Sequence, residues 1–172
     1  MPTNNQQAIA LLHKYKELLI SFSEEQFVQT PPAGGWSYSE VFTHIIAAND
    51  LAVLSIYKCT RPSEEPYRPM DWRVKLILFF GALPPGKYKV PSILAGKSIK
   101  CSKEEATKRM DSLLKRMETL SEKINEASKV AQVKHPRLGY LNAEQWSRFI
   151  LIHTKHHLKQ LARIKRDFNT NS

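Results

Sequence analysis

The chain has 172 residues, of which 42% are hydrophobic and 24% charged, and its formal net charge is +10. This is the size and composition of one soluble globular domain, and no apolar run reaches the roughly 18 residues of a membrane span. The polar start also argues against a secretory signal. We therefore expect a single domain over residues 1–172, cytoplasmic and without a membrane partner.

The positive charge is concentrated in the second part of the chain. Residues 1–60 hold three lysines and five acids, a net charge of −2, whereas residues 61–172 carry +12. A basic half can bind nucleic acid or an anionic substrate. Between residues 103 and 129, however, basic residues alternate with glutamates, and no aromatic residues among them could stack with bases. We expect solvated helix faces and no nucleic-acid partner.

Two long helices are predicted in the first third of the chain. Apolar residues recur every three or four positions from about 5 to 22 and predict the first helix, followed by a turn at 23–26. Ser37 and Glu40 form a capping box that begins the second helix, with Trp36 before it as a hydrophobic staple. This helix extends to about residue 59 and is apolar on more than one side, which predicts deep burial.

The segment from residue 60 to 102 is the least regular. Residues 71–80 predict a short helix that Gly81 ends, although their Val, Ile and Phe content also allows a strand. The loop at 82–100 is long enough to cover a binding site, and a plain crossover is an equal alternative.

Two further long helices are predicted after this crossover. Ser102 and Glu105 form a second capping box, and the apolar stripe of the third helix extends to Ile124. Residues 135–140 predict a turn. Asn142 then caps the last helix, which extends to about residue 167. Four amphipathic helices with one long crossover, between the second and third, predict an all-α four-helix bundle, a fold in which facing helices build metal sites.

Two histidines of the last helix lie one turn apart on its apolar face. His153 and His157 are at positions i and i+4, so their rings can converge on one metal ion about 2.0–2.1 Å from each nitrogen. Burying two imidazoles without a metal or polar partners is costly. His44, on the apolar face of the second helix, supplies a third candidate ligand, although alone it would more often be a core residue.

The other histidines fit a metal site less well. His156 lies about 100° around the helix from His157, which favours a supporting or surface position. His13 is expected to be solvated. His135 precedes a proline in the predicted turn and is expected to be structural, although a site at the mouth of the bundle could include it.

Several kinds of catalytic site are absent from the sequence. The zinc-peptidase motif H-E-x-x-H is not present because Thr154 occupies the position of its glutamate. There is no nucleophile elbow, phosphate loop or Cys-x-x-Cys. Cys59 and Cys101 are expected as free thiols, and Cys59 lies about 22 Å along its helix from His44. The residues themselves therefore support metal binding better than catalysis.

Three motifs together resemble a known family. They are W-S-x-x-E-x-x-x-H at residues 36–44, H-x-x-H-H-x-x-Q at 153–160 and H-P-x-x-G-x-L-x-x-x-x-W at 135–146. The combination resembles the DinB/YfiT-like superfamily of four-helix-bundle metalloproteins, and the third motif resembles its DinB-like branch. The resemblance implies a divalent metal, commonly zinc or nickel, held by His44, His153 and His157.

Two functions remain open. Relatives implied by the resemblance include thiol-dependent S-transferases, maleylpyruvate isomerase and metal-dependent hydrolases, and family alone does not select among them. We favour an enzyme in which the metal activates a water or a low-molecular-weight thiol toward a small-molecule substrate, with His156 and Gln160 orienting the ligands. The alternative is a non-catalytic metal-binding or interaction module whose basic half contacts an acidic partner. Apolar outer faces, including Phe79 and Phe80, also allow a homodimer.

Overall fold

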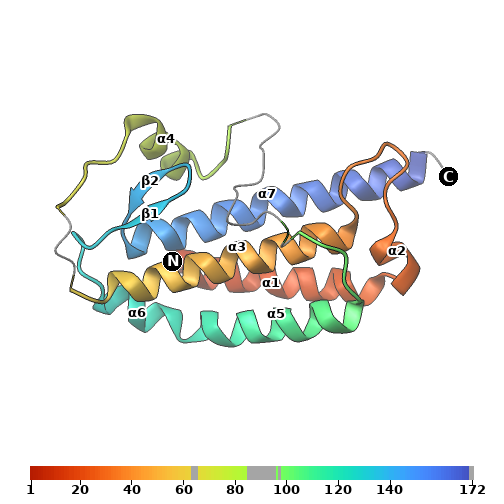
Figure 1. The fold of residues 1–172 in the computed structure, drawn as a ribbon, viewed down its shortest axis with the longest axis horizontal. Helices are drawn as coiled ribbons and strands as arrows, with labels where there is room; N and C mark the ends of the chain where they lie inside the picture. Colours follow the sequence, from red (N-terminus) through yellow and green to blue (C-terminus); the bar gives the residue numbers. More distant parts are fainter. Residues whose placement is uncertain (63–65, 85–95, 97, 171–172) are drawn as a thin grey trace.

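Four long helices form the bundle in the computed structural model, which describes residues 1–62, 66–84, 96 and 98–170. Helix α7 packs against α1 and α3, and α5 packs against the same two helices from the other side (Figure 1). Helices α1 and α7 run in one direction and α3 and α5 in the other. The predicted four-helix bundle is thereby confirmed. Its long helices are α1 (Asn4–Ser21), α3 (Tyr38–Cys59), α5 (Lys103–Glu118), which α6 (Leu120–Glu126) continues, and α7 (Ala143–Thr170).

The crossover from α3 to α5 carries a short helix at one end of the bundle. This helix, α4 (Trp72–Phe80), confirms the helical alternative for residues 71–80. It ends at Gly81, whose φ of 66° is left-handed, and a Cβ there would lie 2.7 Å from Nη2 of Arg148. Most of the 82–100 loop lies outside the described residues, so its suggested role as a cover for a site is not tested.

Capping boxes begin the helices that carry the candidate histidines. At α3, Ser37 Oγ accepts a hydrogen bond from Glu40 N and Glu40 Oε2 accepts one from Ser37 N. Asn142 and Gln145 make the same reciprocal pair before α7. In the predicted box at Ser102, the Ser102 hydroxyl accepts a hydrogen bond from Glu105 N, but the reciprocal bond does not form. The Glu105 carboxylate pairs instead with Arg109 one turn later.

Three local features differ from the predictions. The expected turn at 23–26 is the start of a one-turn helix, α2 (Glu24–Val28). The third long helix is interrupted at Thr119, which separates α5 from α6. The turn at 135–140 belongs to an antiparallel hairpin of β1 (Val133–His135) and β2 (Gly139–Leu141). These differences arise because apolar periodicity does not register a single-residue break or a three-residue strand.

Helix α3 is the central helix of the core. It is long and apolar enough to cross a membrane by length and composition, but 67% of its most apolar window is buried inside the bundle, as in the core helix of a globular domain. Phe42 of this helix packs edge-to-face on Tyr15 and on Phe27, each at 5.4 Å between ring centroids. This burial fixes the helix that carries His44.

Replacing Ser37 by Ala is expected to lower the free energy of unfolding by about 1–2 kcal/mol, because the Glu40 amide of α3 loses its acceptor. Urea denaturation measures the change. Ser112→Ala, on the exposed face of α5, is the matched control and should change it by less than about 0.5 kcal/mol. Equal effects of the two substitutions would contradict this role of the cap.

Candidate metal centre

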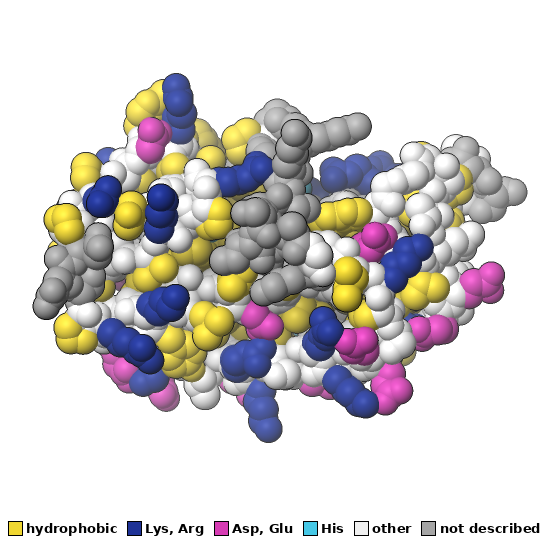
Figure 2. Space-filling view, viewed as in Figure 1, with side chains coloured by type: hydrophobic (Ala, Val, Ile, Leu, Met, Phe, Trp, Pro, Cys, Tyr) yellow, Lys and Arg dark blue, Asp and Glu magenta, His cyan; other side chains and the backbone are white. Residues whose placement is uncertain are grey.

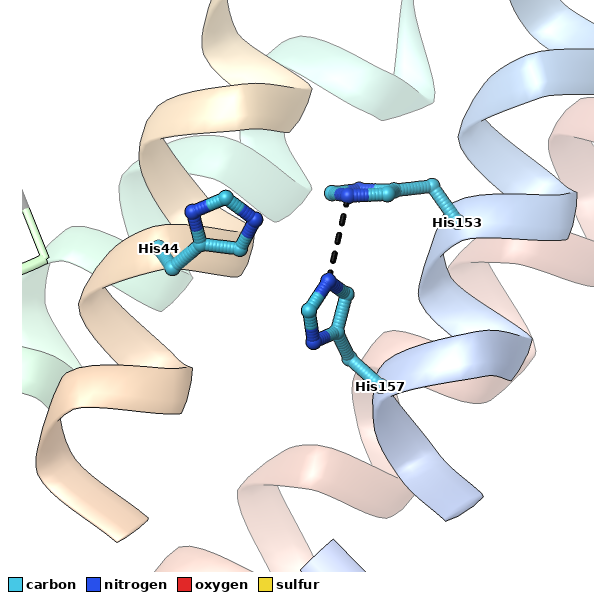
Figure 3. A group of neighbouring side chains, drawn as sticks. All are labelled: His44, His153 and His157. Atoms are coloured by element: carbon cyan, nitrogen blue, oxygen red, sulfur yellow. Dashed lines mark hydrogen bonds between the residues drawn. The ribbon is translucent and has the colours of Figure 1, made fainter. Parts of the chain in front are cut away.

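Three buried histidines from two helices meet inside the bundle. His44 lies in the second turn of α3, and His153 and His157 lie midway along α7 and face it (Figure 3). One nitrogen of each ring lies within 4.8 Å of the other two. The Nε2 atoms of His153 and His157 are 3.1 Å apart. The structure therefore brings together the three residues that the sequence predicted as ligands.

The spacing of these nitrogens suits a metal ion. Two imidazole nitrogens bound at zinc distances with tetrahedral angles lie about 3.3 Å apart, close to the 3.1 Å between His153 and His157. The His44 ring centroid is 4.8 Å from that of His157 and 5.3 Å from that of His153. The three rings thus surround one space between α3 and α7 (Figure 3).

The hydrogen bonds behind the rings leave lone pairs directed into the site. His157 Nδ1 lies 2.7 Å from Gln160 Oε1. The amide oxygen can only accept, so Nδ1 carries the proton and Nε2 presents its lone pair. His44 Nδ1 lies 3.3 Å from Ser98 Oγ, a hydroxyl that can accept in the same way. The Gln160 contact therefore holds His157 in the tautomer that a ligand requires, and the Ser98 contact is compatible with the same tautomer of His44.

His153 is the ring whose hydrogen bonds are incomplete. Since His157 Nε2 accepts, the 3.1 Å contact makes His153 Nε2 the donor. Its Nδ1 is then a buried acceptor without a hydrogen-bond partner among the described residues. A neutral ring bound to a metal through Nε2 would instead carry its proton on Nδ1. Because Nδ1 lacks a partner in either state, the observation that fits a metal ion between the rings is the donor set itself, three inward imidazole nitrogens.

Aromatic side chains pack around the three imidazoles. The Trp36 ring lies 5.0 Å from the His44 ring and stacks on His157 at 6.5 Å. Phe149 stacks on His153 at 5.1 Å, with an interplanar angle of 21°. These contacts restrict rotation of the rings and lower the local dielectric.

A buried polar network holds α7 in place beside His153. The Tyr15 hydroxyl of α1 donates to the Thr154 carbonyl at 2.9 Å, and Asn49 Nδ2 of α3 donates to Thr154 Oγ1 at 3.2 Å. Thr154 thus links all three helices at the level of the site. The position that would carry a catalytic glutamate in a zinc peptidase has a structural role here.

Burial keeps the three imidazoles neutral. It lowers the pKa of His44 to about 4, with a smaller effect of His156, and that of His157 to about 3, with His44 as the second cause. The pKa of His153 also lies well below its usual value, because of burial and then of His157. Because a metal ligand must be unprotonated, the rings are ready to bind near neutral pH.

The remaining histidines lie outside this group. His13 is exposed on α1, as expected. The half-buried His156 has its ring 5.1 Å from that of His157, and burial followed by Arg163 lowers its pKa. His135 is buried in the hairpin, where its Nδ1 accepts hydrogen bonds from two backbone amides at 3.1 and 3.0 Å, so it stabilises the turn.

The two cysteines do not contribute to the site. Both are free and buried. The Cys59 thiol donates to the Leu141 carbonyl at 3.9 Å, and burial raises its pKa to about 11. The pKa of Cys101 is also raised by burial, and its sulfur contacts Ser39. A buried thiol with a raised pKa is neither a ready ligand nor a ready nucleophile.

A family model described as the DinB superfamily matches residues 7–161. The chain belongs to the DinB superfamily. The matched range contains His44, His153, His157 and Gln160. Comparison with curated proteins and with solved structures gave no match. Membership confirms the resemblance seen in the sequence, and the buried three-histidine group fits a metal-binding DinB protein, while the role of each ligand stays a prediction.

Three side chains around this DinB centre were not predicted as site residues. Trp36 is predicted as a staple for α3 and is part of the family motif, but the sequence does not predict that its ring packs on the histidines. Phe149 is one helical turn before His153 on the same face of α7, so its spacing could have predicted their contact. Ser98 lies in the part of the sequence that predicts no regular element, and nothing there indicates that it approaches His44.

Gln160→Ala is expected to weaken zinc binding by about 10- to 100-fold, because His157 loses the acceptor that fixes its tautomer and orientation. A titration against a chromogenic chelator measures the dissociation constant. Gln160→Glu keeps an acceptor and should bind at least as well as Gln160→Ala, whereas the exposed Lys159→Ala should bind like the parent protein. Unchanged affinity in Gln160→Ala would show that the hydrogen bond has no such role.

The metal-free protein is expected to lose stability on acidification. The pKa of His44 lies below its usual 6.5 in the folded protein, so unfolding takes up a proton between the two values. This stability is complete above pH 6.5 and falls toward pH 4, by roughly 3 kcal/mol for a site shifted to about 4. Urea denaturation at pH 7 and pH 5 covers part of this window, and the loss of stability between them should be smaller in His44→Gln than in the parent protein and unchanged in His13→Gln. An equal loss in both variants would contradict the assignment.

Proposed function

We propose that this DinB-superfamily protein is a divalent-metal-dependent enzyme that activates a water or a low-molecular-weight thiol, for hydrolysis or for S-transfer. The observation that supports it is a group of three buried histidines that no carboxylate or thiol joins in the described part of the chain. Three protein ligands are typical of catalytic zinc sites, whereas structural sites have four.

His44, His153 and His157 would hold the ion through their inward nitrogens. Imidazole suits both zinc and nickel, the two metals that we propose. A divalent ion bound there supplies Lewis acidity, which lowers the pKa of a water or thiol in the open position and so provides a nucleophile at neutral pH. Three neutral rings would not compensate the positive charge of a bound divalent ion, and this charge would favour the anionic form of the water or thiol.

The side chains behind the ligands would fix the geometry of this reaction. Gln160 holds His157 in one tautomer, and the network of Tyr15, Asn49 and Thr154 holds the backbone next to His153. Trp36 and Phe149 form apolar walls against the rings, where electrostatic interactions are stronger than in water. His156, adjacent to His157 and half-buried, is proposed as a further orienting residue.

His153→Ala is expected to lose most of the bound metal with only a modest loss of folded structure, because one of three ligands is removed while the rest of α7 remains packed. Elemental analysis of purified protein gives the metal content, and circular dichroism gives the helix content. His13→Ala, which removes an exposed imidazole, is the control. Stoichiometric metal in His153→Ala would show that the ligand assignment is wrong.

Catalysis is tested by a separate experiment. Zinc- and nickel-loaded protein is incubated with several cellular thiols and a panel of electrophiles, and loss of free thiol is followed; ester and amide substrates test hydrolysis. Turnover that disappears in His44→Gln is the expected result. Protein that binds metal stoichiometrically without turnover above the metal-free form in either assay would favour the non-catalytic metal-binding module.

A further inference from the structure

The outer face of α4 carries a stripe of large apolar side chains. Trp72, Leu76, Phe79 and Phe80 are 63%, 45%, 77% and 72% exposed. Their spacing of i, i+4, i+7 and i+8 places all four on one face of the helix. In Figure 2, hydrophobic side chains and Lys or Arg side chains gather at the end of the molecule where Figure 1 places α4. Contiguous apolar surface of this kind marks an interaction site.

Two cations border this stripe. At 100° per residue, Arg73 lies at one edge of the apolar face and Lys75 at the other. Both side chains are exposed, and the Arg73 guanidinium lies 5.3 Å from the centre of the Trp72 ring. Residues 66–81 contain three basic residues and one acid, a net charge of +2. The acid, Asp71, accepts a hydrogen bond from the Arg73 amide as the cap of α4.

The opposite face of α4 is fixed to the bundle. Val74 is buried in the core. Arg148 of α7 donates through Nε to the Leu78 carbonyl at 2.9 Å and through Nη2 to the Phe79 carbonyl at 3.5 Å. Gly81 leaves room for this guanidinium, because a Cβ at position 81 would lie 2.7 Å from Arg148 Nη2. The helix is therefore held with its apolar stripe outward.

We propose that this α4 stripe is a docking surface for an anionic lipid membrane. The outward face of α4 combines aromatic and aliphatic side chains with Arg and Lys at its edges, which are residue types that lie well in the headgroup region. Trp rings favour that interface, and the cations would contact lipid phosphates while the apolar face enters the acyl boundary. The proposal replaces the expectation of no membrane partner, which rested on the absence of a spanning segment.

A second copy of the chain fits the stripe less well. Pairing two such faces would bring cations of like sign together at both edges. The four side chains also offer roughly 500 Å² of apolar surface, less than the about 800 Å² per partner of a typical stable interface. The homodimer expected from the sequence is therefore the competing outcome in the test.

The test uses the full chain with vesicles of phosphatidylcholine alone or mixed with phosphatidylglycerol. Cosedimentation with the anionic vesicles only, weakened by added salt, is the expected result. Tryptophan fluorescence should shift to the blue on binding, and because Trp36 and Trp146 are partly or fully buried, the shift should come from Trp72. Trp72→Phe should therefore bind with little or no shift.

Matched variants distinguish the stripe from general positive charge. Phe79→Ser/Phe80→Ser and Arg73→Gln/Lys75→Gln should each lower the vesicle partition coefficient on the order of tenfold. Ile20→Ser/Val130→Ser replaces two comparably exposed apolar residues elsewhere, and Lys14→Gln/Lys155→Gln removes the same charge elsewhere. Both controls should bind within about twofold of the parent.

Three results would overturn the proposal. The first is no binding to anionic vesicles at low salt. The second is equal binding by the stripe variants and their controls, which would attribute binding to net charge. The third is a concentration-dependent dimer in ultracentrifugation that Phe79→Ser/Phe80→Ser abolishes without affecting vesicle binding, which would assign the stripe to a second copy.

Discussion

The structure depends on three uncharged imidazoles buried between α3 and α7. Burial removes water from polar rings, so each ring needs either hydrogen-bond partners or a metal. His157 has Gln160 behind it and His44 has Ser98, whereas the only side-chain hydrogen bond of His153 within the described residues is the 3.1 Å contact with His157, and its Nδ1 has no partner there. A metal ion between the inward nitrogens would replace the 3.1 Å contact between His153 and His157 and would bind a lone pair of each ring.

The bundle holds these rings in place through contacts on every side. Tyr15 and Asn49 both bind Thr154, so α1 and α3 fix the backbone of α7 next to His153. Trp36 and Phe149 pack on the faces of the imidazoles and limit their rotation. A site held in this way needs little reorganisation to bind an ion, which is the condition for both tight binding and catalysis.

The sequence allowed prediction of those parts that depend on local spacing. The box at Ser37 and Glu40 and the histidine pair on α7 are each contained in a few residues, and both appear in the structure as expected. The break at Thr119 and the hairpin around Gly139 were not predicted. Each depends on one or a few residues within a segment whose pattern indicates a continuous helix or a simple turn. The approach of Trp36 and Ser98 to His44 depends on tertiary packing, which periodicity does not describe.

The most direct test of the metal centre is X-ray absorption spectroscopy of the protein loaded with one equivalent of zinc. We expect three imidazole nitrogens at about 2.0–2.1 Å, identified by multiple scattering from the rings, with the remaining coordination from light atoms not supplied by the protein. A sulfur ligand at about 2.3 Å, or scattering from fewer than three imidazoles, would contradict a centre built from His44, His153 and His157.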